Sequence, residues 1–191
     1  MSDCPPRAAY IHVPFCAHRC GYCNFTLIAG RDDLIERYLA ALRQELVWLE
    51  SPRAVYTLFI GGGTPTHLPP AALDRLCELV LEWFRPAAGG EITVEANPAG
   101  LDADRLDVLA AHGVTRLSLG AQSFHPAKLK SLERDHAPAD INAAVELART
   151  RLASVSLDLI FAAPGETLAD WQADLESALR LQPDHLSTYG L

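Results

Sequence analysis

Three cysteines lie within eight residues of the chain, in the segment PFCAHRCGYCNF at residues 14–25. Cys16, Cys20 and Cys23 follow the spacing C-x3-C-x2-C. Cysteine thiolates bind zinc ions and iron–sulfur clusters. In a reducing compartment, cysteines this close indicate a metal or redox site before a structural disulfide. The segment is therefore a candidate metal centre.

Two kinds of metal centre fit the cysteines, a zinc site and an iron–sulfur cluster. A structural zinc site usually has four ligands, and His12 or His18 could supply the fourth. Such sites usually pair two ligand-bearing segments, however, and the chain has no second one. Three cysteines in one loop better match three corners of a cubane cluster whose fourth iron has no protein ligand. Three unliganded thiols would be prone to oxidation, which makes that alternative the weakest.

The remaining cysteines carry no predicted metal role. Cys77 lies on the apolar stripe of ALDRLCELVLEWF, so we expect it to be a small buried hydrophobic residue. Cys4 lies near the N-terminus, and we assign it no role.

Strand-like and helix-like segments alternate along the chain and must position this loop. The predicted strands are 8–13, 55–60, 91–98, 114–124, 154–165 and 185–191. The predicted helical segments are 32–50, 69–84, 101–113, a broken stretch ending near 149, and 167–183. This order predicts an α/β fold with a parallel sheet and right-handed crossovers. Both an open doubly wound sheet and a partial TIM-type barrel fit it.

The positions of polar residues and glycines favour the barrel. The cysteine loop follows the first strand, and residues 61–64 (GGGT) follow the second. Glu95 and Asn97 close the third strand, and Gln122 closes the fourth. In a TIM-type barrel these carboxyl ends form one mouth, where active sites are built. We therefore predict a partial (β/α)6 barrel of parallel strands.

Length and composition indicate a single globular domain. The chain has 191 residues, of which 49% are hydrophobic and 21% are charged. Its formal net charge of −8 argues against general nucleic-acid binding. No apolar run approaches a membrane span, and the N-terminus lacks the apolar core of a signal peptide. We expect a cytoplasmic protein.

Five segments in chain order resemble one known family: YIHVPFCAHRCGYCNF, FIGGGTPT, VEANP, RLSLGAQSF and SLDLIFAAPGET. The cysteine motif resembles the signature of the radical S-adenosylmethionine (SAM) superfamily. The five segments together resemble its oxygen-independent coproporphyrinogen III oxidase-like family, which includes heme chaperones. The resemblance covers essentially the whole chain.

The resemblance implies both cofactors and their ligands. Cys16, Cys20 and Cys23 would ligate three irons of a [4Fe-4S] cluster, and SAM would chelate the fourth. One electron, from a donor such as a flavodoxin or ferredoxin, would cleave SAM to methionine and a 5'-deoxyadenosyl radical. The positions matching the family's SAM contacts are Tyr10, Tyr22, Gly62, Gly63, Thr64, Glu95, Gln122, Arg134 and Asp158.

Several of these residues also have a purely structural interpretation. The glycines could form only a tight turn. Glu95 could be a solvated strand end, and Arg134 alone resembles a surface charge. Asp158 interrupts an apolar strand and should have a partner, since a buried unpaired carboxylate is costly. His12 could form a supporting hydrogen bond behind the metal ligands, or it could only pack within its strand.

Two departures from the family pattern decide which member this chain resembles. The family's oxidase has a further cysteine two residues after the third, in a C-G-C run, whereas this chain has Cys23-Asn24-Phe25. That run resembles the heme-chaperone branch, which would bind heme as cargo for a recipient protein. The alternative is porphyrinogen oxidation. The family also continues into a C-terminal domain, so the end of the chain at Leu191 predicts a truncated radical SAM core.

Overall fold

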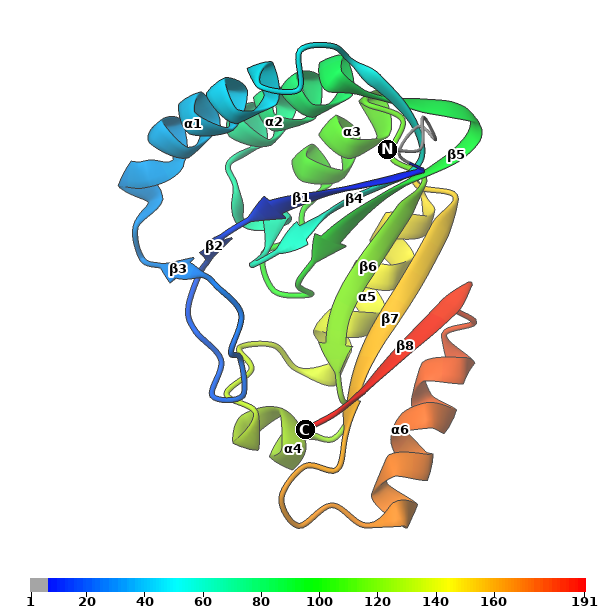
Figure 1. Ribbon diagram of the computed structural model, residues 1–191. Coiled ribbons are helices and arrows are strands. Elements are labelled where there is room, and N and C mark those ends of the chain that lie inside the picture. Colours follow the sequence, from blue (N-terminus) through cyan, green and yellow to red (C-terminus); the bar gives the residue numbers. More distant parts are fainter. Residues whose placement is uncertain (1–6) are drawn as a thin grey trace, which may run out of the picture.

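The computed structural model describes residues 7–191, and Cys4 lies outside them. Six parallel strands form one curved sheet (Figure 1). They are β1 (Ala8–Val13), β4 (Arg53–Gly62), β5 (Phe84–Ala96), β6 (Arg116–Gln122), β7 (Ser154–Phe161) and β8 (His185–Gly190). Their order in the sheet follows their order in the chain. A doubly wound sheet would reverse its strand order at a switch point, so the partial barrel is confirmed and the open sheet is excluded.

The helices cover the outer face of the sheet (Figure 1). The crossover helices are α1 (Ile35–Val47), α2 (Pro70–Trp83), α3 (Ala103–Ala111), α5 (Pro138–Arg149) and α6 (Leu168–Arg180). Short pieces precede or interrupt them: η1 (Asp32–Leu34), η2 (Pro65–His67) and α4 (Pro126–Ser131). Right-handed crossovers place successive helices on the same side, which leaves the inner face of the sheet open to a ligand.

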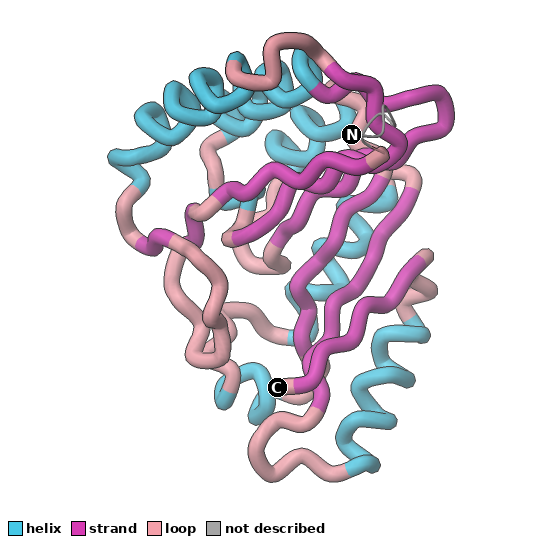
Figure 2. Tube along the Cα trace, viewed as in Figure 1, coloured by secondary structure: helices cyan, strands magenta, loops and turns pink. Residues whose placement is uncertain are grey.

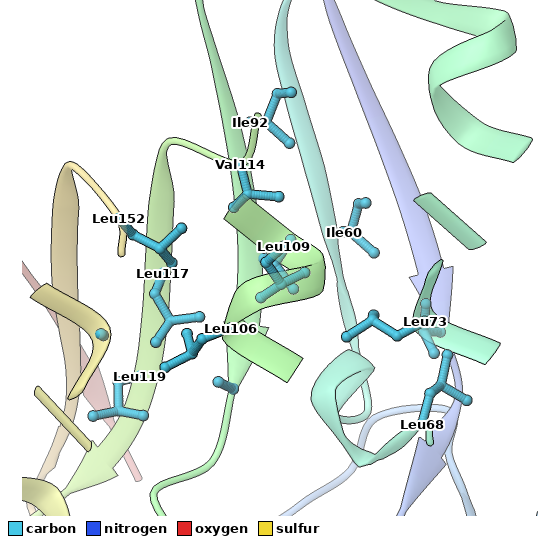
Figure 3. Packing of buried hydrophobic residues seen from close by; sticks show 14 of the residues in the cluster. Ile60, Leu68, Leu73, Ile92, Leu106, Leu109, Val114, Leu117, Leu119 and Leu152 are labelled. Atoms are coloured by element: carbon cyan, nitrogen blue, oxygen red, sulfur yellow. The ribbon is translucent and has the colours of Figure 1, made fainter. Parts of the chain in front are cut away.

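The strands alternate between the two faces, and this alternation separates the core from the inner surface. Apolar residues of the strands pack under the helices, as Figure 3 shows for Ile60, Ile92, Leu117 and Leu119. Leu73, Leu106 and Leu109 meet them from α2 and α3. Each fully buried leucine or isoleucine contributes about 1.5–3 kcal/mol through removal of apolar surface from water.

The inner face carries polar side chains at the alternate positions. His12 pairs in register with Gly61, and Glu95 pairs with Ser118. Asp158 follows on β7, opposite Ser187 of β8. Because side chains two residues apart point to the same face, these groups share the concave side of the sheet.

The observed elements differ from the predicted ranges mainly at β5. The prediction started this strand at residue 91, but β5 begins at Phe84 and pairs with β4 in two blocks separated by a register shift. Pro86, Gly89 and Gly90 give the first block the composition of a loop. The shift is a bulge-like irregularity, which the sequence pattern could not distinguish from a connection.

Two very short strands, β2 (Phe15–Cys16) and β3 (Ile28–Ala29), pair in parallel. Cys16 ends β2, and Cys20 and Cys23 lie in the long loop between the two strands. Figure 2 shows this loop beside α4, at the end of the sheet where the strands finish. The fold therefore brings the loop to the predicted mouth of the barrel.

Candidate cluster and cofactor site

One cavity of about 450 Å³ lies at the carboxyl ends of the strands. All three cysteines of the motif line it. The other predicted site residues that line it are Tyr22, Gly62, Gly63, Thr64, Glu95, Gln122, Arg134 and Asp158. Residues from positions 16 to 158 thus converge on a single space, as the barrel prediction requires.

The cysteine loop is held by its own backbone and by two neighbouring side chains. The guanidinium of Arg19 donates to the carbonyl oxygens of Cys23 and Leu27, at 3.1 and 3.3 Å. His12 Nε2 lies 2.7 Å from the carbonyl oxygen of Thr26. His12 therefore binds the returning end of the loop, which supports its interpretation as a hydrogen-bonding residue.

The three sulfurs have different surroundings. Cys16 and Cys20 are buried and Cys23 is half-buried. Cys16 Sγ lies 3.5 Å from the hydroxyl of Thr64, and Cys20 Sγ accepts a 3.2 Å hydrogen bond from Arg134 Nη1. Burial raises the pKa of the Cys16 thiol, and the Thr64 hydroxyl acts in the opposite direction.

The donor set fits a cluster better than a single ion. Within residues 7–191, no three His, Cys, Asp or Glu side chains gather closely enough to hold one metal ion. A cubane does not require such convergence, because each thiolate binds a separate iron. Of the two histidines considered as zinc ligands, His12 binds the Thr26 carbonyl oxygen, away from the sulfurs. His18 Nε2 lies 2.9 Å from the Glu133 carbonyl oxygen and 3.6 Å from Cys20 Sγ.

The glycine turn after β4 is shaped by close approaches within the protein. A Cβ on Gly63 would lie 2.7 Å from the carbonyl oxygen of Phe15. Gly62 has φ +117°, which side chains rarely adopt, and its amide donates a 2.8 Å hydrogen bond to Glu95 Oε2. The turn thus joins β2, β4 and β5, and it still lines the cavity.

Two carboxyl groups face the cavity from neighbouring parts of the inner face. Burial raises the pKa of Glu95 to about 7; the Gly62 amide opposes this shift and Asp158 adds to it. Burial also raises the pKa of Asp158, against hydrogen bonds from Ser118 and Ser187. Ser118 Oγ donates to Asp158 at 2.9 Å, so the partner expected for this carboxylate includes a protein side chain.

Gln122, Arg134 and Tyr22 close the cavity on the side of β6. Gln122 ends β6 with φ +63°, an uncommon conformation for a residue with a side chain. Arg134 Nη2 donates to Asn97 Oδ1 at 2.6 Å and to the Gly120 carbonyl oxygen at 3.1 Å. Burial raises the pKa of Tyr22 to about 12, although Arg134 lowers it.

Tyr10 is the one predicted site residue that does not line the cavity. Its ring stacks on Phe59 at 5.9 Å, and its hydroxyl lies 3.3 Å from His12 Nδ1. The side chain is 56% exposed. Its cofactor role stays a prediction.

Asn97 and Ser118 are among the lining residues that were not predicted as site residues, and His18, considered only as a zinc ligand, also lines the cavity. Asn97 was noted only as closing its strand, yet it bridges Thr64 and Arg134. Ser118 pairs in register with Glu95 on the neighbouring strand, so both side chains point to the same face of the sheet. This pairing could have indicated Ser118 as a site residue. Cys77 is buried on α2, as expected.

The fold and site define a class of protein: a partial parallel barrel whose mouth gathers three cysteines, a glycine turn and paired acids. The Radical SAM superfamily profile matches residues 10–178, and the chain belongs to that superfamily. Among curated proteins, it is 40% identical over 197 residues to the "Heme chaperone HemW" of Escherichia coli, covering 100% of this chain and 52% of that protein.

Two further comparisons confirm the resemblance to coproporphyrinogen oxidase-like proteins. The chain is 38% identical over 190 residues to the heme chaperone HemW of Bacillus subtilis, covering 97% of this chain and 50% of that protein. The solved structure of coproporphyrinogen III oxidase (HemN) from Escherichia coli, a radical SAM enzyme, superposes with a TM-score of 0.87 at 36% identity. That match covers 97% of this chain and 44% of the oxidase chain.

The chain spans about half the length of the curated relatives it matches. In the part that the structure describes, no helix is long and apolar enough to cross a membrane.

Proposed function

We propose that this chain is the cluster- and SAM-binding core of a heme chaperone. The observation that carries the proposal is the single cavity lined by all three cysteines and by the glycine turn, Glu95 and Arg134. A site that binds a redox cluster and a charged cofactor together needs soft thiolate ligands beside hydrogen-bonding and charged groups.

The cysteines hold the [4Fe-4S] cluster in this proposal, and the other lining residues hold SAM. A reduced cluster with bound SAM supplies one-electron radical chemistry. Gly62, Gly63 and Thr64 present backbone groups without bulky side chains in the way. Arg134 places a fixed positive charge beside the cavity, and Glu95 and Asp158 offer acceptors on its inner wall.

The chaperone assignment rests on the residues after the third cysteine and on the relatives. Cys23-Asn24-Phe25 lacks the additional cysteine expected of the oxidase, and the HemW proteins are named heme chaperones. Heme is the proposed cargo, a heme protein the recipient, and a flavodoxin or ferredoxin the electron donor. Residues 1–191 form one radical SAM core in a cytoplasmic protein.

A second candidate is an oxygen-independent coproporphyrinogen III oxidase. The observation favouring it is the 0.87 TM-score to HemN. That similarity concerns the core fold, which sets the cofactor site but leaves the chemistry of the substrate open.

Cluster assembly tests the first part of the proposal. We expect anaerobic reconstitution to load about four irons and about four sulfides per chain, as a [4Fe-4S] cluster requires, and to give a reduced-cluster EPR signal. Cys20→Ala should abolish assembly, whereas Cys77→Ala, altered in the α2 core, should retain it. Bound zinc without a cluster signal, or a full [4Fe-4S] signal in Cys20→Ala, would refute the assignment.

Cargo binding and turnover separate the two candidates. We expect the reconstituted protein to bind heme in an absorbance titration and to form no protoporphyrinogen from coproporphyrinogen III and SAM under anaerobic conditions. Formation of protoporphyrinogen would favour the oxidase instead.

A further inference from the structure

A continuous chain of polar contacts joins two of the three cysteines. Cys16 Sγ lies 3.5 Å from Thr64 Oγ1, and Asn97 Nδ2 lies 3.0 Å from the same oxygen. Asn97 Oδ1 is 2.6 Å from Arg134 Nη2, and Arg134 Nη1 is 3.2 Å from Cys20 Sγ. The residues come from four different segments, so only the folded chain assembles this path.

The direction of every hydrogen bond in the path follows from Arg134. A guanidinium donates only, so Asn97 must present its oxygen to Arg134. The Asn97 amide nitrogen then faces Thr64 and donates to the hydroxyl oxygen. Thr64 already accepts this bond, and its own proton is free to point at Cys16. The contact at Cys16, ambiguous when taken alone, thereby acquires a direction.

Burial and backbone contacts keep the path in place. Thr64 is 6% exposed and Cys16 is 8% exposed, so water competes little for the hydroxyl proton. The Thr64 amide donates to the Phe15 carbonyl oxygen at 2.8 Å, which holds Thr64 against the segment before Cys16. At the other end, Arg134 also donates to the Gly120 carbonyl oxygen.

We propose that Asn97 is a positioning residue that orients the Thr64 hydroxyl as a donor to Cys16, so that two of the three cysteine sulfurs receive hydrogen bonds. This inference rests on the proposed ligation of a cluster by these cysteines. Hydrogen bonds to cluster sulfurs stabilise the more negative, reduced state and raise the reduction potential. Asn97, which contacts neither sulfur, thus acts on the potential through Thr64.

The experiment is an EPR-monitored redox titration of the reconstituted protein without SAM, in wild type, Thr64→Val, Thr64→Ser and Asn97→Asp. Thr64→Val removes the hydroxyl at nearly constant volume and should lower the midpoint potential, and Thr64→Ser should restore it. Thr64→Ala replaces Thr64→Val if the latter assembles no cluster. Thr66→Val alters a nearby buried threonine that bonds no cysteine in the described residues, and should leave the potential unchanged.

Asn97→Asp tests whether Asn97 orients the Thr64 hydroxyl or only contacts it. A carboxylate accepts from both Arg134 and Thr64, so the Thr64 proton turns away from Cys16. The added negative charge also lowers the potential, so Asn97→Asp alone does not distinguish the effect of the charge from that of the Thr64 orientation. The double variant Asn97→Asp/Thr64→Val makes this distinction. If Asn97 acts through Thr64, Thr64→Val should lower the potential less in the Asn97→Asp background than in wild type.

Two outcomes would overturn the inference: an unchanged potential in the hydroxyl-free variant, or additive shifts in the double variant. Iron, sulfide and EPR intensity report cluster assembly independently of the potential. An absent cluster in wild type therefore refutes the proposed function, whereas a present cluster with an unshifted potential refutes only the role of Asn97.

Discussion

Arg134 donates a 3.2 Å hydrogen bond to the sulfur of Cys20 across 114 residues of sequence. The same guanidinium bonds Asn97 and the carbonyl oxygen of Gly120. One side chain thus connects the cysteine loop, the end of β5, the end of β6 and the segment after α4. Its planar fork makes this possible, because it presents several donors in fixed directions.

Replacing Arg134 by lysine should weaken SAM binding. Lysine keeps the charge but cannot reproduce the fork, so we expect the SAM dissociation constant of the reconstituted protein to rise about tenfold, equivalent to about 1.4 kcal/mol. Equilibrium dialysis with labelled SAM measures it. Arg151→Lys, at a surface pair with Asp107, is the matched control. An unchanged dissociation constant in Arg134→Lys would contradict the prediction.

Glu95 should make the cluster-free protein less stable as the pH rises. Its pKa is about 7 in the folded chain against an ordinary value of 4.5, so the folded state retains a proton that the unfolded state has lost. The free energy of unfolding should therefore fall between pH 4.5 and 7, by up to about 3 kcal/mol from this group. Asp158, whose pKa is also raised, contributes with the same sign.

Glu95→Gln tests this contribution directly. The amide cannot ionise, and its oxygen can still accept from the Gly62 amide, so the decrease between pH 5 and 8 should become smaller. Urea unfolding at the two pH values measures the difference, with Glu78→Gln on the exposed side of α2 as the control. Equal pH profiles for wild type and Glu95→Gln would exclude this role.

Removing Asp174 should destabilise the chain strongly. This fully buried carboxylate accepts from Lys128 Nζ at 3.0 Å, Ser123 Oγ at 2.8 Å and the Phe124 amide at 2.6 Å. Asp174→Ala leaves these donors without that acceptor and should cost about 3 kcal/mol in guanidinium unfolding. Glu82→Gln, an exposed change on α2, should stay within about 0.5 kcal/mol. A loss below about 1 kcal/mol for Asp174→Ala would show that the site relaxes around the change.

Gly63→Ala should lower the free energy of unfolding more than an alanine at Gly113, a glycine with a positive φ but free space around it. The new Cβ would lie 2.7 Å from the backbone oxygen of Phe15, which cannot move without displacing Cys16. Gly113 has φ +72° and no atoms within 4 Å of such a Cβ, so Gly113→Ala should cost only about 1–2 kcal/mol of backbone strain. Unfolding free energies and iron content after reconstitution compare the two, and an equal cost with full iron content would contradict the expectation.

The order of the strands could be predicted because each element carries its own local pattern. Apolar runs followed by glycine or polar residues marked β4 and β6, and helical spacing marked α2 and α6. The start of β5 could not be predicted, because its proline and glycines are typical of a loop and only pairing with β4 makes them a strand. The local composition of a segment does not show whether a partner strand lies beside it.

The sequence by itself determined the three cysteines, their spacing and the polar residues at each strand end, because these depend on neighbouring positions. Only the tertiary structure decided that Asn97 bridges Thr64 and Arg134, that Glu95 is held by the Gly62 amide, and that Tyr10 lies outside the cavity. Hydrogen-bond direction and burial depend on groups brought together from distant segments. The curvature of the sheet supplies that proximity, and no local pattern encodes it.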